Sequence, residues 1–137
     1  MKDAKIERMS QMSVFKRCNR SQLEHLAEIT DEVTVGPGHV ISEQGHGLHY
    51  IYFVNSGKAD VVIDGQQIEP VGPGAVIGEI SMFDQGPAMA TVTTAESCDL
   101  VVIDHRKVMD ALETVPGLAL VALHDMARRL RLQGSHS

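Results

Sequence analysis

GPGAVIGEISMFDQGPAMATV, from Gly72 to Val92, is the stretch of this chain that decides its fold. Glycines at positions 72, 74 and 78 let the backbone approach a ligand closely, although each could equally serve a turn. A short helix is expected to open at Gly78-Glu79, where unpaired N–H groups and the positive end of the helix dipole favour an anion. The Glu79 carboxylate at that helix start can accept a hydrogen bond from a hydroxyl group.

The sequence around this stretch alternates with a period of two, as half-buried strands do. Between residues 31 and 104, short apolar runs are cut repeatedly by Gly or Pro, which predicts an antiparallel sandwich or barrel. Asp64-Gly65 predicts a two-residue hairpin turn, because a type I′ turn needs positive φ at both central residues. The last strands are expected at Val92 and over residues 100–103. The alternating pairs are Val33/Val35, His39/Ile41, Ile51/Phe53 and Val61/Ile63.

Helical patterns flank the strand zone, over residues 2–30 and 105–132. Ser21 and Glu24 have the spacing of a capping box, which predicts a helix start. Asp104 is expected to cap a helix running to about residue 112, and Pro116 suits the first turn of a second helix. On that last helix one apolar stripe is expected to be buried, with the members Leu120, Leu123, Ala127 and Leu130.

Length and charge narrow the function classes. At 137 residues and a net charge of −6, the chain is long enough for one core without disulfides or metals. Lys58 is the only Lys or Arg between Ser21 and His105, so a nucleic-acid backbone is not an expected partner. No apolar run approaches the roughly 20 residues of a membrane span, and the start has no signal core. The two cysteines form no spaced framework, so we expect a cytoplasmic protein without membrane contact.

Four segments keep the spacing of a known family. Together they resemble the cyclic-nucleotide-binding domains, the family of catabolite activator proteins and protein kinase A regulatory subunits. Gly78-Glu79-Ile80-Ser81-Met82 resembles the Gly-Glu-Leu-Ala-Leu of the phosphate-binding cassette, and Pro87-Ala88-Met89-Ala90-Thr91-Val92 resembles its Pro-Arg-Ala-Ala-Thr-Val. The other two are Gly38 to Gly45, like the early strand pair, and Tyr52 to Gly57, like Tyr-Phe-Ile-x-x-Gly.

The resemblance implies a ligand site and also a departure within it. It implies that Glu79 binds the ribose of cAMP or cGMP, within a candidate site of Gly78, Glu79, Ile80, Ser81, Ala88, Met89, Ala90, Thr91 and Arg129. The arginine that would bind the cyclic phosphate is Ala88 here. The segment Met126 to Leu130 is similar to the last helix of the catabolite activator branch, where the arginine matching Arg129 lies near the ribose carboxylate. Arg129 is therefore the candidate replacement cation, or the partner of Glu79.

A cupin metalloenzyme is the competing enzyme hypothesis. His46 and His49, near Glu43, stand where a cupin places metal ligands. The spacing is His-x-x-His rather than His-x-His, and no histidine follows Gly74 before His105. Because a metal needs three or four converging ligands, a solvated loop is the favoured interpretation of these histidines.

The sequence thus predicts a single domain over residues 1–137, mainly β with flanking helices. It comprises helices over 2–30, an antiparallel β-roll of jelly-roll type with the cassette over 31–104, and two C-terminal helices over 105–132. The predicted function is a regulatory, ligand-sensing module without enzyme activity or resident cofactor. It would relay to an effector domain or protein partner through the C-terminal helices, with a weak homodimer as a further expectation. The alternative is a degenerate module that binds no nucleotide and works by protein contacts alone.

Overall fold

The computed structural model describes residues 2–134, which divide into two compact units. The roll unit runs from Thr30 to His105 and holds all the strands described below. The helical unit combines the described residues up to Ile29 with those from Arg106 onward. The cassette therefore belongs to the roll unit, and most of the flanking helical sequence to the other.

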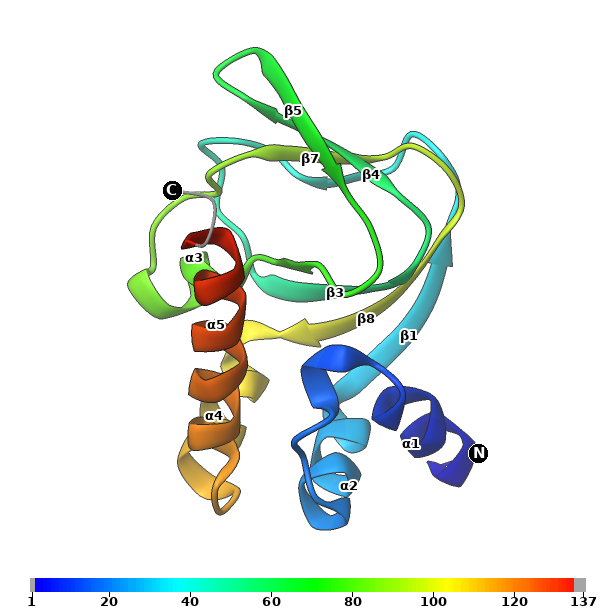
Figure 1. Ribbon diagram of the computed structural model, residues 1–137, viewed down its shortest axis with the longest axis vertical. Helices are drawn as coiled ribbons and strands as arrows, with labels where there is room; N and C mark the ends of the chain where they lie inside the picture. The colour runs from blue at the N-terminus through cyan, green and yellow to red at the C-terminus, as the bar shows by residue number, and fades with distance from the viewer. Residues whose placement is uncertain (1, 135–137) are drawn as a thin grey trace. The chain divides into compact units, whose positions relative to one another are not determined.

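Two antiparallel four-stranded sheets build the roll unit (Figure 1). One sheet has the order β1-β8-β3-β6 and the other β2-β7-β4-β5, so neighbouring strands are often distant in sequence. This arrangement confirms the predicted β-roll. The strands are β1 (Thr30–Val35), β2 (Val40–Ser42), β3 (Tyr50–Ser56), β4 (Ala59–Ile63), β5 (Gln66–Val71), β6 (Val76–Ile77), β7 (Thr91–Thr94) and β8 (Cys98–Asp104).

The core of the roll is filled by apolar side chains from both sheets. Val54 and Leu100 contribute from one sheet, and Val61 and Val92 from the other, all of them buried. The predicted hairpin joins β4 to β5, with φ of 52° at Asp64 and 77° at Gly65. Both values are positive, as a type I′ turn requires.

The helical unit contains α1 (Lys2–Ser10), the 3-10 turn η1 (Ser13–Phe15), α2 (Arg20–Ile29), α4 (His105–Thr114) except its first residue, and α5 (Leu118–Gly134). The capping box of α2 differs from the prediction. Asn19 Oδ1 accepts from the Gln22 N–H, and Gln22 Oε1 accepts from the Asn19 N–H, both at 2.8 Å. The reciprocal pair is therefore Asn19/Gln22, two residues before Ser21/Glu24, because asparagine and glutamine satisfy the same two backbone donors.

The connection between the last two helices also differs from the prediction. α4 spans His105–Thr114, and α5 spans Leu118–Gly134. Pro116 lies in the turn between them rather than in the first turn of α5. Its carbonyl accepts a hydrogen bond from Gln22 Nε2 at 3.0 Å, and Gly117 follows with φ of 76°. The Gln22 side chain of α2 thus holds the turn between α4 and α5.

The predicted buried stripe of α5 is wrong. Leu120, Leu123 and Leu130 are 72%, 60% and 62% exposed, and Ala127 is exposed too. The face that is covered follows a different stripe, with Leu118 and Asp125 buried and Ala122 and Arg129 half-buried. Two members of that stripe carry charge, so a search for apolar periodicity selected the opposite face.

Candidate functional site

A single glycine sets the geometry of the cassette. The short helix α3 (Glu79–Asp84) follows β6, and its N-cap residue Gly78 has φ of 92°. A Cβ at this position would lie 2.5 Å from the carbonyl oxygen of Tyr50. Both the backbone conformation and the close approach to β3 therefore require glycine, which explains the residue in physical terms.

The carbonyl of Gly78 is held by a histidine that the sequence analysis did not single out. His105 Nε2 lies 3.0 Å from it, and because a carbonyl can only accept, this nitrogen carries the proton. The backbone N–H of His105 donates to the carbonyl of His49 at 2.9 Å. Desolvation by burial lowers the pKa of His105, against the opposing effect of the hydrogen bond to Gly78. The neutral ring of His105, the first residue of α4, thus holds the backbone at the start of α3.

Ala88 is a buried residue between two exposed neighbours, Pro87 and Met89. It is 3% exposed, its N–H donates to the carbonyl of His46 at 2.8 Å, and its carbonyl accepts from the N–H of Gly45 at 2.9 Å. The backbone around position 88 is therefore fixed on both sides by the loop after β2. The side chain itself is a methyl group and can offer a ligand neither charge nor a hydrogen bond.

Two hydroxyl groups of the predicted site help to hold the cassette together. Ser81 Oγ donates to the carbonyl of Pro87 at 3.3 Å, and Thr91 Oγ1 accepts from the backbone N–H of Gln44 at 3.0 Å. The carbonyl of Ala90 accepts from Ser42 Oγ. These bonds tie α3, the segment after it and the loop after β2 into one frame.

The remaining cassette residues differ in exposure. Glu79 is half-buried in the first turn of α3, whereas Ile80 and Met89 are exposed. Lys58 is the one Lys or Arg of the roll, and it is exposed beyond the end of β3. The structure thus brings eight predicted site residues, Gly78 to Ser81 and Ala88 to Thr91, into the roll unit.

Arg129 belongs to the helical unit, on α5. Its Nε donates to Asp125 Oδ2 at 2.8 Å, and Arg128 Nη2 donates to Asp125 Oδ1 at 2.8 Å. Asp125 is therefore a buried acid satisfied by the two arginines that follow it. The i+3 and i+4 spacing of these residues could have revealed the cluster in the sequence. The assignment of Arg129 to a ligand phosphate or to Glu79 stays a prediction.

The loop that suggested a metal carries an exposed pair. His46 Nδ1 lies 3.1 Å from Glu43 Oε2, with both side chains more than half exposed. Within residues 2–134, no three side chains of His, Cys, Asp or Glu gather as a metal site would need. Cys18 lacks the lowered pKa of a reactive thiol, because burial, with the nearby charge of Asp125, raises its pKa to about 11. The neighbouring bases Lys16 and Arg17 do not offset that effect.

The roll with its inserted α3 defines a jelly-roll fold, and comparison with known proteins makes the assignment particular. Residues 32–115 match the family described as cyclic nucleotide-binding domain. That match covers more than half of the chain, so the chain belongs to this family. The predicted family and fold are confirmed.

Relatives and solved structures agree with this assignment. The chain is 26% identical over 130 residues to a CRP-like cAMP-activated global transcriptional regulator of Mycobacterium tuberculosis, covering 91% of this chain and 58% of the regulator. It is 31% identical over 114 residues to the acetyltransferase Pat of Mycolicibacterium smegmatis, covering 80% of this chain and 34% of that protein. The N-terminal domain of a transcriptional regulator from Streptomyces coelicolor A3(2) superimposes with a TM-score of 0.71 at 29% identity, covering 97% of this chain and 94% of that one.

These comparisons place the chain among regulatory cyclic nucleotide-binding domains and lend no support to the cupin hypothesis. The chain spans little more than half the length of the Mycobacterium tuberculosis regulator and about a third of the length of the acetyltransferase. No helix within residues 2–134 is both long and apolar enough to cross a membrane.

Proposed function

We propose that this chain is a ligand-sensing module whose cyclic-nucleotide pocket recognises the phosphate weakly. In this proposal Glu79 binds the ribose of cAMP or cGMP, and the cassette backbone from Gly78 to Ser81 and from Ala88 to Thr91 surrounds the ligand. Binding is relayed through His105 into α4 and α5, and from there to an effector domain or partner in the cytoplasm. Neither nucleic acid nor a membrane is a partner of this chain in the proposal, because the roll is acidic.

The observation that carries the proposal is the buried methyl group of Ala88. It stands where the family resemblance expects a phosphate-binding arginine, and it is 3% exposed. Lys58 is the only Lys or Arg in the sequence of the roll, and its side chain is exposed. A cyclic phosphate in this pocket would therefore lack the charge-assisted pair of hydrogen bonds that an arginine supplies.

The size of the effect follows from the cost of an unpaired buried charge. Removing one partner of such a pair typically costs about 3–5 kcal/mol. Since each 1.4 kcal/mol is a factor of ten, the affinity should fall on the order of a hundred- to several-thousand-fold. The same cost explains why a module without nucleotide binding is the natural rival to this proposal.

Calorimetric titration with cAMP and with cGMP tests the proposal. The unmodified chain should bind weakly, and Ala88→Arg should tighten binding at least a hundredfold. Ala88→Gln is the matched control, because it adds similar bulk without charge and should leave the affinity low. Tight binding by the unmodified chain, unaffected by Ala88→Arg, would contradict weak phosphate recognition.

The exposed leucines of α5 favour a protein partner, with or without nucleotide. Leu120, Leu123 and Leu130 are each more than half exposed, a row of apolar side chains that a contact would bury. We expect a weak homodimer or an effector contact through this face. Sedimentation over a concentration series should show association that Leu123→Glu removes and Lys107→Glu, on α4, leaves unchanged. A chain that stays monomeric at every concentration would restrict this face to an effector.

A further inference from the structure

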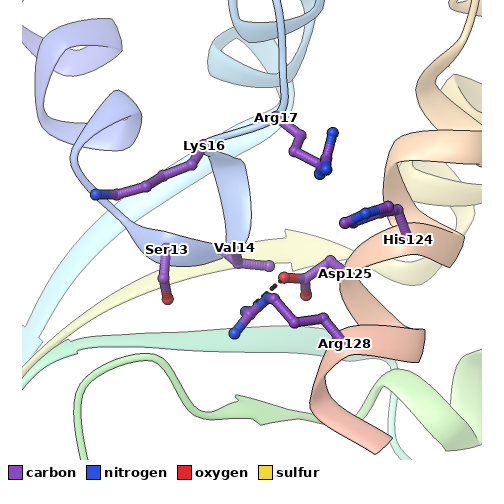
Figure 2. A pocket seen from close by; sticks show the side chains of 7 residues that line it. All are labelled: Ser13, Val14, Lys16, Arg17, His124, Asp125 and Arg128. Carbon is purple, nitrogen blue, oxygen red and sulfur yellow. Dashed lines mark hydrogen bonds and ion pairs between the residues drawn. The ribbon is translucent and has the colours of Figure 1, made fainter. Parts of the chain in front are cut away.

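The helical unit has a pocket of its own, formed without any residue of the cassette (Figure 2). Its volume is about 330 Å³. One wall comes from η1 and the turn that follows it, and the other from α5. The lining residues are Ser13, Val14, Lys16, Arg17, His124, Asp125 and Arg128. Ligand pockets in proteins begin at about 300 Å³, so this volume is sufficient for a small molecule.

The lining of this pocket is positively charged, in a chain whose net charge is −6. Lys16, Arg17 and Arg128 are permanent cations, and Asp125 is the only acidic residue among the seven. Asp125 is 6% exposed, and its two oxygens accept from Arg128 and Arg129 at 2.8 Å. Its charge is thereby compensated, so the carboxylate holds Arg128 in place without giving the pocket a negative field.

The donors at the pocket opening are available to a ligand. Arg17 and His124 are exposed, and neither side chain has a hydrogen bond or an ion pair within the part of the chain that the structure describes. Figure 2 shows these two side chains facing one another, with Arg128 directed toward Asp125 beside them, whereas the ammonium group of Lys16 points away. Two arginines and a histidine thus line one pocket, with Arg17 and His124 together and the Arg128 guanidinium beside Asp125.

The geometry points to a binding site for a small phosphate-bearing molecule in this pocket. Arg17 and Arg128 present planar, permanently charged donor groups that match phosphate oxygens, and His124 adds a further ring nitrogen. The side chain of Val14 supplies an apolar contact for the organic part of the ligand. Asp125 acts as a positioning residue, because it fixes Arg128 and does not itself contact the anion. This inference is independent of the cassette and of what it binds.

Titration with glycerol phosphate, followed by backbone amide NMR shifts, tests the inference on the full chain. Saturable shifts are expected at Arg17, His124 and Arg128, while the amides of Gly78 and Ala88 stay unchanged. Arg17→Gln and Arg128→Gln should each weaken binding at least tenfold. Lys107→Gln removes the same charge from an exposed position of α4 outside the pocket, and should leave binding unaltered.

Glycerol and inorganic sulfate complete the experiment. Glycerol should not bind, because it lacks the anion. If sulfate binds as tightly as glycerol phosphate, the pocket holds an adventitious anion only, and the inference is overturned. Equal weakening by all three substitutions would show charge screening rather than a site, and shifts confined to Gly78 and Ala88 would move the binding to the cassette. Either result rejects the inference. Because Arg17 and Lys107 are exposed, the Arg17→Gln and Lys107→Gln variants should fold.

Discussion

At the scale of single residues, Gly57 is a position where the roll leaves no room for a side chain. A Cβ there would lie 2.4 Å from the carbonyl oxygen of Ser97 and 2.6 Å from Cys98 Sγ, and φ is 93°. Gly45 has a similar φ of 85° but nothing within 4 Å of its Cβ position. Substitutions at the two positions therefore distinguish the cost of backbone strain, which both share, from the cost of a steric conflict, which only position 57 has.

We expect Gly57→Ala to destabilise the chain more than Gly45→Ala does. Both substitutions force alanine into the left-handed region, which costs roughly 1–2 kcal/mol. Overpacking against β8 should add about 1–3 kcal/mol at position 57 alone. Urea denaturation measures both free energies of unfolding. Equal losses at the two positions would show that the backbone near Ser97 yields to the added methyl group.

His105 makes the stability depend on pH. Burial lowers its folded-state pKa below the ordinary value of 6.5, with a further lowering from His49 and an opposite effect from the hydrogen bonds to Gly78 and Tyr50 and from the charge of Asp104. The unfolded chain therefore takes up a proton before the folded chain does. The contribution of His105 to stability is present above about pH 6.5, and it is lost as the pH falls below that value toward the folded-state pKa.

The measurement is the urea midpoint between pH 7.5 and 5.5, together with an NMR titration of the His105 ring. The unmodified chain should lose stability across this window, and His105→Gln should lose less of it, because glutamine can keep the hydrogen bond to Gly78 without titrating. A ring that titrates above pH 6.5 would reverse the expected sign.

At the scale of elements, the start of α2 gives the sharpest contrast between pattern and structure. Asn19 exchanges hydrogen bonds with Gln22 at 2.8 Å, whereas the predicted pair was Ser21 and Glu24. Asn19→Ala should cost about 1 kcal/mol of stability, within the usual range of 0.5–2 kcal/mol for an N-cap. Ser21→Ala is the matched control and should change stability by no more than about 0.5 kcal/mol. If Ser21→Ala proves the more costly of the two, the original capping box is the correct one.

The elements also show what the sequence could and could not predict. Strand alternation, the Asp64-Gly65 turn and the spacing of the cassette were sufficient for the roll, because each depends on local backbone geometry. The covered face of α5 was not predictable from apolar periodicity, since Asp125 and Arg129 lie on it. His105 was missed for a similar reason: its contact with Gly78 joins residues 27 positions apart, and no local pattern marks such a pair.

At the scale of the whole molecule, the prediction concerns one charged residue from each unit. Glu79 belongs to the roll unit and Arg129 to the helical unit, and both side chains are half-buried. The family resemblance implies that these two residues act together at the ribose. If they do, the chain behaves as the single domain expected over residues 1–137.

A double-mutant cycle between Glu79→Ala and Arg129→Ala tests that coupling. Opposite charges that are partly buried interact more strongly than exposed pairs, which give at most about 1 kcal/mol. We expect the two substitutions to be non-additive in stability or in ligand affinity, with an interaction energy of about 0.5–3 kcal/mol.

Arg128 is the matched control, because it bonds to the same carboxylate of Asp125 from the preceding position. The cycle between Glu79→Ala and Arg128→Ala should be additive within about 0.5 kcal/mol. Additivity in both cycles would mean that Arg129 serves Asp125 alone, and the relay from cassette to α5 would then run only through the chain at His105. Equal coupling in both would instead indicate a general effect of positive charge on α5, without a specific pair.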